Sequence, residues 1–370
     1  MESVAAFTDT YLPTVNGVTY TVKTWRERWE AHGGRMDVVY PGSSGHEPEA
    51  GEHPVGSLPL PFYSGFRVGT PRVPADVVTP DVVHAHTPFS LGLAALRYAR
   101  KHDVPFVATY HTPTAEYTNY FTDYEPVREG LASISQQYER WFLNHADAVI
   151  VPSETTGRFL TDELGVDVSP TVVSNGVDVE RFRPVDTAAF RERHELEADT
   201  TLVGYTGRHG HEKSLPDILA ACERLDREVT VVFGGDGPAR EELTAEAERR
   251  DVDARFLGFL DREALPAFYA TLDAFLFPSP VETQGLVALE SFACGTPVVA
   301  VDSGALSDTV DDGVTGYHYP EDDIDGFAAA IERTLDEREQ LRTGCLDRRE
   351  EISVESSVDR LAELYADLRD

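Results

Sequence analysis

The sequence predicts an α/β protein made of two doubly wound domains, each built on a parallel β-sheet. Short apolar runs rich in β-branched residues alternate with longer amphipathic stretches along the whole chain, which is the pattern of successive βαβ units. The apolar runs are nearly continuous, as expected of strands that are buried on both faces of a sheet. The length of 370 residues allows two domains of ordinary size.

The first half of the chain supplies the strands and helices of one domain. Strands are expected at residues 3–7, 36–41, 82–86, 105–111 and 147–153. Amphipathic stretches between them predict helices, and the first of these ends at Gly33 and Gly34, where glycine permits the left-handed conformation that closes many helices. A further strand is expected to end near Ser174.

The second half repeats this rhythm. Strands are expected at residues 201–207, 228–235, 254–259, 274–279 and 297–302, with a helix after each of the first four. The turn "NGVD" and the proline-bearing "RFRP" suggest a boundary, so we expect domains at 1–184 and 185–352. Residues 353–370 carry apolar side chains at helical spacing, which predicts a terminal amphipathic helix that packs back toward the first domain.

The charge of the chain is strongly acidic. It has 65 acidic residues against 32 lysines and arginines, a formal net charge of -33, and the only lysines are Lys23, Lys101 and Lys213. The acids are spread along the whole chain, which indicates a solubilising coat for very high salt and a halophilic source, an archaeon in our interpretation. A nucleic-acid partner is not expected, because such partners need a basic patch.

The cysteines and the apolar segments bear on location. Cys222, Cys294 and Cys345 lack metal-binding or redox spacing, which suggests a reducing cytoplasm. No stretch approaches the length of a membrane span, and the start of the sequence lacks the basic and apolar regions of a signal peptide. We therefore expect a cytoplasmic protein whose membrane contact, if any, is peripheral and at the inner face.

Polar residues at the ends of several strands are candidates for chemistry. Asn16 and Gly17 lie between the first strand and its helix, where backbone N–H groups suit a phosphate, although a plain turn glycine explains them as well. Arg208 and Lys213 follow a central strand and suit a diphosphate, or Lys213 pairs with Glu212. The glycine-rich run 234–237 lacks a P-loop pattern and is interpreted as a tight turn near the ligand.

Two glutamates eight residues apart form the most specific pattern. Glu282 is expected in the loop after a strand, and Glu290 about one and a half turns into the next helix, among apolar neighbours. Carboxylates accept hydrogen bonds from pairs of sugar hydroxyls, including those of a ribose. The alternative is a solvated acid or a charge at a helix start. The amides of residues 284–286 are expected to face the same point.

Three histidines and an aromatic segment complete the candidates. His111 ends a strand and is a candidate for catalysis, although a lone histidine is more often structural. His84 and His86 are expected to face opposite sides of their strand, and no cluster of metal ligands is evident. The segment 112–127 is rich in tyrosine and suits an acceptor or an interface, or ordinary helix packing.

Taken together, these segments resemble the retaining glycosyltransferases of family 4, which have the two-domain GT-B fold with Rossmann-like domains. The resemblance covers nearly the whole chain. It rests on "FTDTYLPTVNGV" (7–18), "VVHAHTPFSLG" (82–92), "ATYHT" (108–112), "NGVDVERFRP" (175–184), "GRHGHEK" (207–213), "FGGDGP" (233–238), "FLGFL" (256–260) and "FPSPVETQGLVALESFACGTPVVA" (277–300). The ordered set is far more specific than any one member.

The resemblance implies roles for the candidate residues. Arg208 and Lys213 neutralise the diphosphate of the donor, Glu282 holds its sugar, Glu290 holds its ribose, and His111 reaches the sugar. The remaining donor-binding positions are Gly17, Leu257, Gly258, Gln284, Gly285 and Leu286. Acceptor-binding positions are Asp9, Tyr117, Tyr120 and Tyr124.

The reaction implied is transfer of a hexose from a UDP- or GDP-sugar to an acceptor hydroxyl with retention of configuration, without a metal or other cofactor. The segment "ATYHTPTAEYTNYF" is similar to members that glycosylate diacylglycerol-type lipids, so a membrane lipid such as archaeol is the expected acceptor. A soluble sugar, a polyprenyl-linked glycan, a nucleotide-sugar epimerase or phosphorylase of the same fold, and a non-catalytic binding scaffold are the alternatives.

Overall fold

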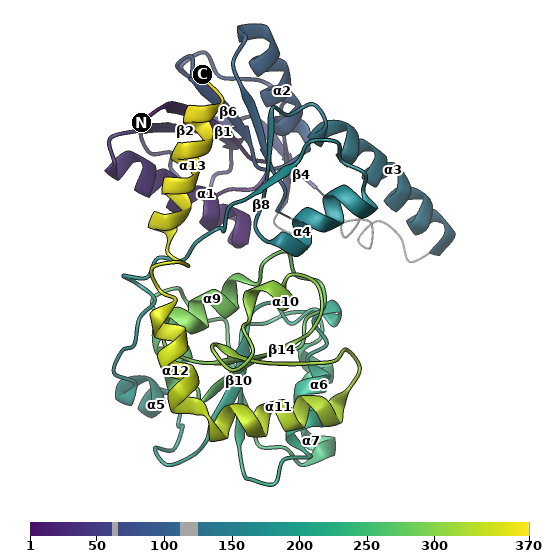
Figure 1. The fold of residues 1–370 in the computed structure, drawn as a ribbon, viewed down its shortest axis with the longest axis vertical. Coiled ribbons are helices and arrows are strands. Elements are labelled where there is room, and N and C mark those ends of the chain that lie inside the picture. The colour runs from purple at the N-terminus through teal and green to yellow at the C-terminus, as the bar shows by residue number, and fades with distance from the viewer. Residues whose placement is uncertain (61–65, 112–124, 370) are drawn as a thin grey trace. The chain divides into compact units, whose positions relative to one another are not determined.

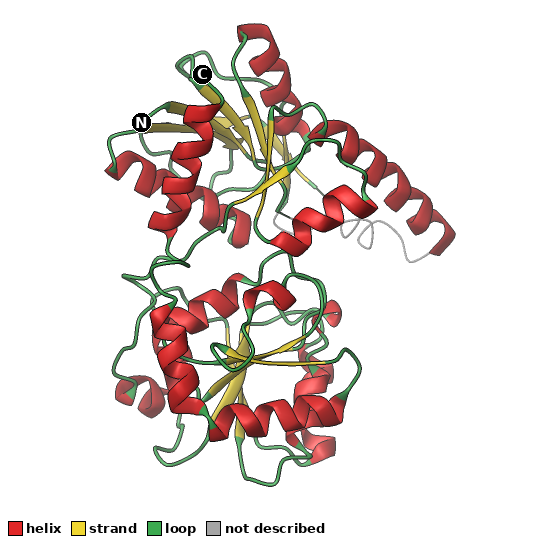
Figure 2. Cartoon of the chain, viewed as in Figure 1, coloured by secondary structure: helices red, strands yellow, loops and turns green. Residues whose placement is uncertain are grey.

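The structure is a computed structural model that describes residues 1–60, 66–111 and 125–369 (Figure 1). The predicted acceptor residues Tyr117, Tyr120 and Tyr124 lie outside this part of the chain. The chain divides into two compact units, one formed by Met1–Asn175 with Val354–Asp370 and the other by Gly176–Ser353. Each unit is an α/β domain around its own sheet, as Figure 2 shows by its strands and helices.

The first unit is built on a seven-stranded sheet in the order β3-β2-β1-β6-β7-β8-β9, with every neighbouring pair parallel. Its strands are β1 (Ser3–Phe7), β2 (Arg35–Pro41), β3 (Glu52–Val55), β6 (Val82–Ala85), β7 (Phe106–Thr109), β8 (Ala148–Val151) and β9 (Pro170–Val172). Its helices are α1 (Gly17–Ala31), α2 (Ser90–His102), α3 (Glu125–Leu143), α4 (Glu154–Arg158), the π-helical turn η2 (Phe159–Glu163) and α13 (Val354–Asp367). A small antiparallel ribbon joins β4 (Ser57–Pro59) to β5 (Arg67–Gly69).

Both faces of this sheet are covered. On one face Leu91, Leu96, Phe142 and Leu160 belong to a buried apolar cluster from α2, α3 and the η2 turn. On the other face α1 and the terminal helix α13 pack side by side, and Figure 1 shows α13 in yellow along this unit. The cluster there includes Trp25, Trp29, Val358, Leu361 and Tyr365. The amphipathic pattern of the tail is therefore satisfied inside the first unit.

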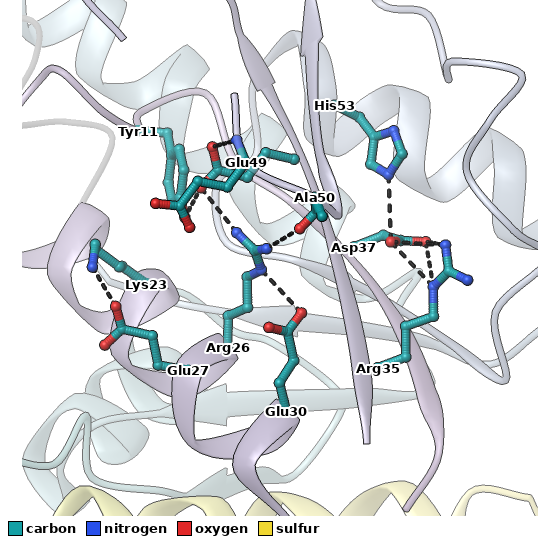
Figure 3. A network of polar contacts seen from close by, with 11 residues as sticks. Tyr11, Lys23, Arg26, Glu27, Glu30, Arg35, Asp37, Glu49, Ala50 and His53 are labelled. Atoms are coloured by element: carbon teal, nitrogen blue, oxygen red, sulfur yellow. Dashed lines mark hydrogen bonds and ion pairs between the residues drawn. The ribbon is translucent and has the colours of Figure 1, made fainter. Parts of the chain in front are cut away.

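A buried ionic network anchors the loop that follows β1. Arg26 of α1 contacts Glu52 of β3 with 2.9 Å between Nη1 and Oε1, and it also bonds Glu30 and the carbonyl of Ala50 (Figure 3). The hydroxyl of Tyr11 donates to the same Glu52 oxygen at 3.0 Å. Since a buried charge must be paired and hydrogen-bonded, this network fixes the β1–α1 loop against the sheet.

The second unit is built on a six-stranded parallel sheet in the order β12-β11-β10-β13-β14-β15. Its strands are β10 (Leu202–Thr206), β11 (Thr230–Gly234), β12 (Ala254–Gly258), β13 (Ala274–Phe277), β14 (Val298–Val301) and β15 (Gly316–Tyr319). Its helices are α5 (Ala188–Arg193), the 3₁₀ turn η3 (His211–Lys213), α6 (Pro216–Cys222), α7 (Arg240–Arg250), α8 (Leu265–Thr271), α9 (Leu286–Ala293), α10 (Leu306–Thr309), α11 (Ile324–Asp336) and α12 (Arg338–Asp347). The two parallel sheets confirm the predicted fold class.

The structure places the unit boundary before the position expected from the sequence. We expected the change after Pro184, whereas the second unit already begins at Gly176. The reason is that the N–H of Val177 donates to the carbonyl of Ile352 at 2.9 Å and that Phe182 is fully buried in the core of the second unit. The turn "NGVD" marks the crossing itself, and the segment after it already belongs to the second unit.

The packing of α13 yields a prediction on stability. Replacing Leu361 with alanine leaves a cavity between α13, α1 and the sheet, so the free energy of unfolding of the first unit should fall by about 2–5 kcal/mol. The exposed Glu363 lies on the same helix, and Glu363→Ala serves as the control with a change within about 0.5 kcal/mol. Denaturant titration measures both. Equal stability of the two variants would contradict the assigned packing of α13.

Candidate active site

The reversal of strand order in the second sheet positions the central residues of the site. The first strand of this unit, β10, pairs with β11 on one side and with β13 on the other. Connections from β10 and β13 therefore leave in opposite directions, and the carboxyl ends of these two strands border the crevice in which ligands of doubly wound sheets bind. The loop after β10 carries Arg208 and Lys213, and the loop after β13 carries Glu282.

Lys213 and Glu282 meet at this point. Their Nζ and Oε1 atoms are 2.7 Å apart, and each side chain is 18% exposed, so the pair is sheltered yet reachable from solvent. The expected alternative partner of Lys213, Glu212, instead pairs with Arg208, whose side chain is 46% exposed. The structure thus joins two of the predicted catalytic residues directly and leaves Arg208 on the outer side of the same loop.

The glycine-rich turn after β11 holds the loop that bears the two cations. A Cβ at Gly235, whose φ is +100°, would lie 1.9 Å from the carbonyl oxygen of Gly207, so only glycine permits this approach. His209 holds the loop after β10 against the turn after β11 by hydrogen bonds. Its N–H donates to the carbonyl of Asp236, its carbonyl accepts from the N–H of Ala239, both at 2.9 Å, and its Nε2 donates to the carbonyl of Gly234 at 3.1 Å.

His209 is a residue that sequence reasoning missed. Its side chain is fully buried, and burial lowers its pKa, which keeps the ring neutral at physiological pH. The signal in the sequence is the pair of glycine-rich segments after β10 and β11, but no local pattern tells which side chain joins them.

Glu290 lies inside α9 and is only 7% exposed, so it does not belong to the acidic coat. Tyr269 of α8 donates its hydroxyl to Oε2 at 2.8 Å, and Nη1 of Arg262 lies 3.5 Å from Oε1. Burial raises the pKa of this carboxyl, while Arg262 and the bond from Tyr269 oppose that rise. The site therefore holds a sheltered acceptor whose neighbours partly stabilise its charge.

Close packing at the start of α9 fixes the loop between the two glutamates. Gly285 precedes the helix with a φ of +79°, and a Cβ there would lie 2.7 Å from Leu306 and 3.0 Å from Phe277. Gln284 is buried, and its main-chain carbonyl accepts a hydrogen bond from the hydroxyl of Thr309 at 2.6 Å. The loop is thus packed against the body of the unit. That the amides of residues 284–286 contact a donor stays a prediction.

Two of the predicted donor-binding residues, Leu257 and Gly258, end the edge strand β12. Leu257 and Gly258 line a hollow together with Asp236, Arg240 and Phe256. The carbonyl of Gly258 accepts from the N–H of Gly235 at 2.7 Å, which ties this hollow to the same glycine-rich turn.

In the first unit, Asp9 and Gly17 belong to the connection after β1. The buried carboxylate of Asp9 accepts from the hydroxyls of Thr87 and Ser90 at 2.8 and 2.7 Å and from the N–H of Leu91, so it stabilises the start of α2. Burial raises its pKa, and these hydrogen bonds oppose the rise. Gly17 is exposed and opens α1. The observed contacts of Asp9 are structural, and its role in acceptor binding stays a prediction.

The expectation that His84 and His86 face opposite sides of their strand is wrong. Alternate residues of a strand share a face, and the two rings lie 4.1 Å apart between centroids. His86 also contacts His111, with 3.1 Å between Nδ1 and Nε2. The three rings form one buried cluster, and within the described residues no group of three or more histidine, cysteine or acidic side chains is arranged to hold a metal ion.

The family model described as Glycosyltransferase Family 4 matches residues 15–181, and the model described as Glycosyl transferases group 1 matches residues 186–345. The alpha-monoglucosyldiacylglycerol synthase of Streptococcus pneumoniae is 30% identical over 98% of this chain and 85% of its own length. A GDP-mannose-dependent alpha-mannosyltransferase of Corynebacterium glutamicum is 29% identical over 85% of this chain and 75% of its own length.

Solved structures share the fold. Sucrose-phosphate synthase from Thermosynechococcus elongatus superposes with a TM-score of 0.77 at 21% identity, over 100% of this chain and 99% of that protein. HepE from Anabaena, solved with UDP and glucose, gives 0.77 at 18% identity, over 99% of this chain and 100% of that protein.

Two parallel-sheet domains of this kind make up the GT-B fold. The chain belongs to glycosyltransferase family 4 and is a hexosyltransferase.

Burial of Glu290 predicts how stability depends on pH. The pKa of Glu290 is raised in the folded protein above its ordinary value of 4.5. Between these two pKa values the folded protein therefore keeps the proton of Glu290, whereas the unfolded chain has released it. Wild-type stability should therefore fall as pH rises from about 4.5 toward the raised value, and Glu290→Gln should lose this fall. The free energy of unfolding of E290Q relative to wild type should rise over that range in denaturant titrations. Glu241→Gln, at an exposed acid of α7, is the control, and parallel curves for E290Q and wild type would refute the prediction.

Proposed function

We propose that the protein transfers a hexose from a nucleotide sugar to an acceptor hydroxyl with retention of configuration, and that the second unit binds the donor. The observation that carries this proposal is the Lys213–Glu282 pair at the point where the strand order reverses. Lys213 is a cation that suits a diphosphate, and Glu282, which contacts it, is a carboxylate that suits sugar hydroxyls. The structures of HepE with UDP and glucose support the same class of donor.

The pair has a role in the absence of donor. Two sheltered charges of opposite sign neutralise one another, which holds both side chains in place. When a donor binds, its diphosphate replaces the carboxylate as the partner of Lys213, and Glu282 becomes available to accept hydrogen bonds from the sugar. Arg208, which is more exposed, exchanges Glu212 for phosphate oxygens in the same way.

Leaving-group stabilisation is the main chemical task. As the bond from the anomeric carbon to the diphosphate oxygen breaks, negative charge develops on the diphosphate, and Arg208 and Lys213 stabilise it. The acceptor oxygen attacks the same face of the sugar, and the departing diphosphate takes the proton of the acceptor hydroxyl. This front-face route gives retention without a carboxylate nucleophile, and two protein cations take the place of a metal ion.

The nucleoside part of the donor has a separate place in this scheme. Glu290 accepts hydrogen bonds from the ribose hydroxyls, while Tyr269 and Arg262 hold its carboxylate. Leu257 and Gly258 bind the base at the end of β12.

The acceptor is proposed to be a membrane lipid. The relative from Streptococcus pneumoniae is named for synthesis of a glucosyl diacylglycerol. On α3 the side chains of Leu131, Ile134 and Trp141 recur at helical spacing and are 38%, 66% and 43% exposed, which suits a helix that lies at a lipid interface. Among the described residues no helix is long and apolar enough to cross a membrane. A soluble sugar or a polyprenyl-linked glycan remains the alternative acceptor.

The experiment that tests this function is a matrix of donors and acceptors. UDP- and GDP-hexoses are incubated with archaeol, diacylglycerol or soluble sugars, at low and at molar salt and with or without EDTA, and products are identified by mass spectrometry. A glycolipid formed in the presence of EDTA is expected. Glycosylated soluble sugar alone would replace the lipid proposal, and isomerised donor without acceptor would indicate an epimerase.

Loss of Lys213 should abolish most of the activity. Lys213→Ala removes a charge that stabilises the departing diphosphate, so turnover should fall by about 10²- to 10³-fold. Lys101→Ala removes an exposed lysine of α2 and is the matched control. Rates are measured with saturating donor, and circular dichroism checks the fold. A Lys213→Ala enzyme with wild-type turnover would overturn the assignment.

Removal of the two glutamates should separate binding from transfer. Glu290→Ala deletes the ribose partner, so calorimetry should show weaker binding of UDP or GDP. Glu282→Ala leaves the ribose partner intact and frees Lys213, so nucleotide binding should persist while transfer is impaired. Equal loss of nucleotide affinity in both variants would contradict this division.

A further inference from the structure

Three histidines of the first unit meet at the carboxyl ends of β6 and β7. His84 is completely buried, His86 is 2% exposed and His111 is 8% exposed. The ring of Trp25 from α1 lies within 6.5 Å of all three rings, measured between centroids. The resemblance implies a role in transfer for His111 alone, whereas His84 and His86 are buried beside it with no assigned role.

The contacts divide the cluster into two parts. His86 and His111 are nearly coplanar, at 19° between ring planes, and Nδ1 of His86 lies 3.1 Å from Nε2 of His111. His84 is bonded elsewhere, to the hydroxyls of Thr109 and Tyr365, each at 2.6 Å. Within the cluster, His111 therefore shares its hydrogen bond with His86.

The chemistry of two neutral imidazoles restricts this bond. A neutral ring carries one N–H, so a bond between two ring nitrogens requires a proton on one of them and a lone pair on the other. If His86 donates from Nδ1, the proton of His111 lies on its own Nδ1. If His111 donates from Nε2, its Nδ1 is an acceptor. The position of the proton on His86 therefore decides whether Nδ1 of His111 is a hydrogen-bond donor or an acceptor.

Burial keeps these rings in the neutral form for which this restriction holds. It lowers the pKa of His84 and of His111 to about 3 and that of His86 well below its ordinary value. Protonation of one ring also opposes protonation of its neighbours, because their charges would repel at this distance.

We propose that His86 is a positioning residue that holds His111 in a single tautomer and ring orientation. This inference rests on the proposed function, together with the role in reaching the donor sugar that the resemblance implies for His111. A sugar hydroxyl forms a good hydrogen bond with a ring nitrogen only under two conditions. The nitrogen must be the matching donor or acceptor, and it must point toward the hydroxyl. The hydrogen bond with His86 couples the tautomer of His111 to that of His86 and fixes the direction of the His111 ring, while the His84–Tyr365 contact fixes the neighbouring ring from the side of α13.

Two variants of His86 and one control test the proposal. His86→Leu removes the hydrogen bond, whereas His86→Asn keeps a group that can donate or accept near the position of Nδ1. Tyr365→Phe removes the hydroxyl that bonds His84 and leaves the His86–His111 contact intact. Protein with ¹⁵N-labelled histidine reports the tautomer of His111 by NMR, and rates of transfer are measured on the same samples.

Wild type and Tyr365→Phe should show one tautomer of His111, and His86→Leu should show a mixture. His86→Leu should lower kcat by about tenfold to a hundredfold with little change in the KM of the donor, because orientation and not binding is lost. His86→Asn should restore the single tautomer and most of kcat.

The outcomes separate this inference from the proposed function. Unchanged His111 tautomer and kcat in a folded His86→Leu protein would overturn the role of His86. A tautomer that depends on His86 in a protein without transfer activity would preserve the structural inference and reject the function. Loss of folding in His86→Leu leaves His86→Asn as the decisive variant, and a mixed tautomer there would count against the proposal.

Discussion

Each sheet reverses its strand order beside its first strand, and this constraint places the chemistry of the molecule. In the second unit the reversal leaves the carboxyl ends of β10 and β13 adjacent without a connection that crosses between them. Charged side chains from the two following loops then pair with one another or with a ligand. Lys213 and Glu282 pair with one another at 2.7 Å. The same topology in the first unit brings the ends of β1, β6 and β7 together, where Asp9 and the histidine cluster lie.

Rigid backbone supports these groups. Arg208 and Lys213 are carried by a loop that is hydrogen-bonded through His209 to the turn after β11 and is packed so closely that Gly235 tolerates no side chain. In the first unit, the Arg26–Glu52 network gives comparable support to the loop that leads to Gly17. Long cationic side chains are flexible, so fixing the backbone beneath them reduces the ordering needed when a diphosphate binds.

Much of this arrangement was predictable from the sequence, and the exceptions have physical causes. Alternation of apolar runs and amphipathic stretches predicted both sheets, and the apolar frame of Glu290 predicted its burial. Periodicity carries no information on partners distant in sequence, so the contacts of Glu290 with Tyr269 and of His86 with His111 could not be predicted. The error at His84 and His86 was a misassigned strand face.

The Lys213–Glu282 pair and the histidine cluster present buried polar groups in different ways, and the difference suits the proposed reaction. In the second unit Lys213 and Arg208 pair with carboxylates, and a departing diphosphate would take the place of those partners. In the first unit burial lowers the pKa values of the clustered His84, His86 and His111, which keeps these three rings neutral. Breaking a glycosidic bond leaves positive charge on the sugar, so an imidazolium beside it would raise the barrier, whereas a neutral ring can hold a hydroxyl without that penalty. A cluster of three histidines thus gives His111 polarity without charge, which a solitary exposed histidine, with a pKa near 6.5, would not provide as dependably.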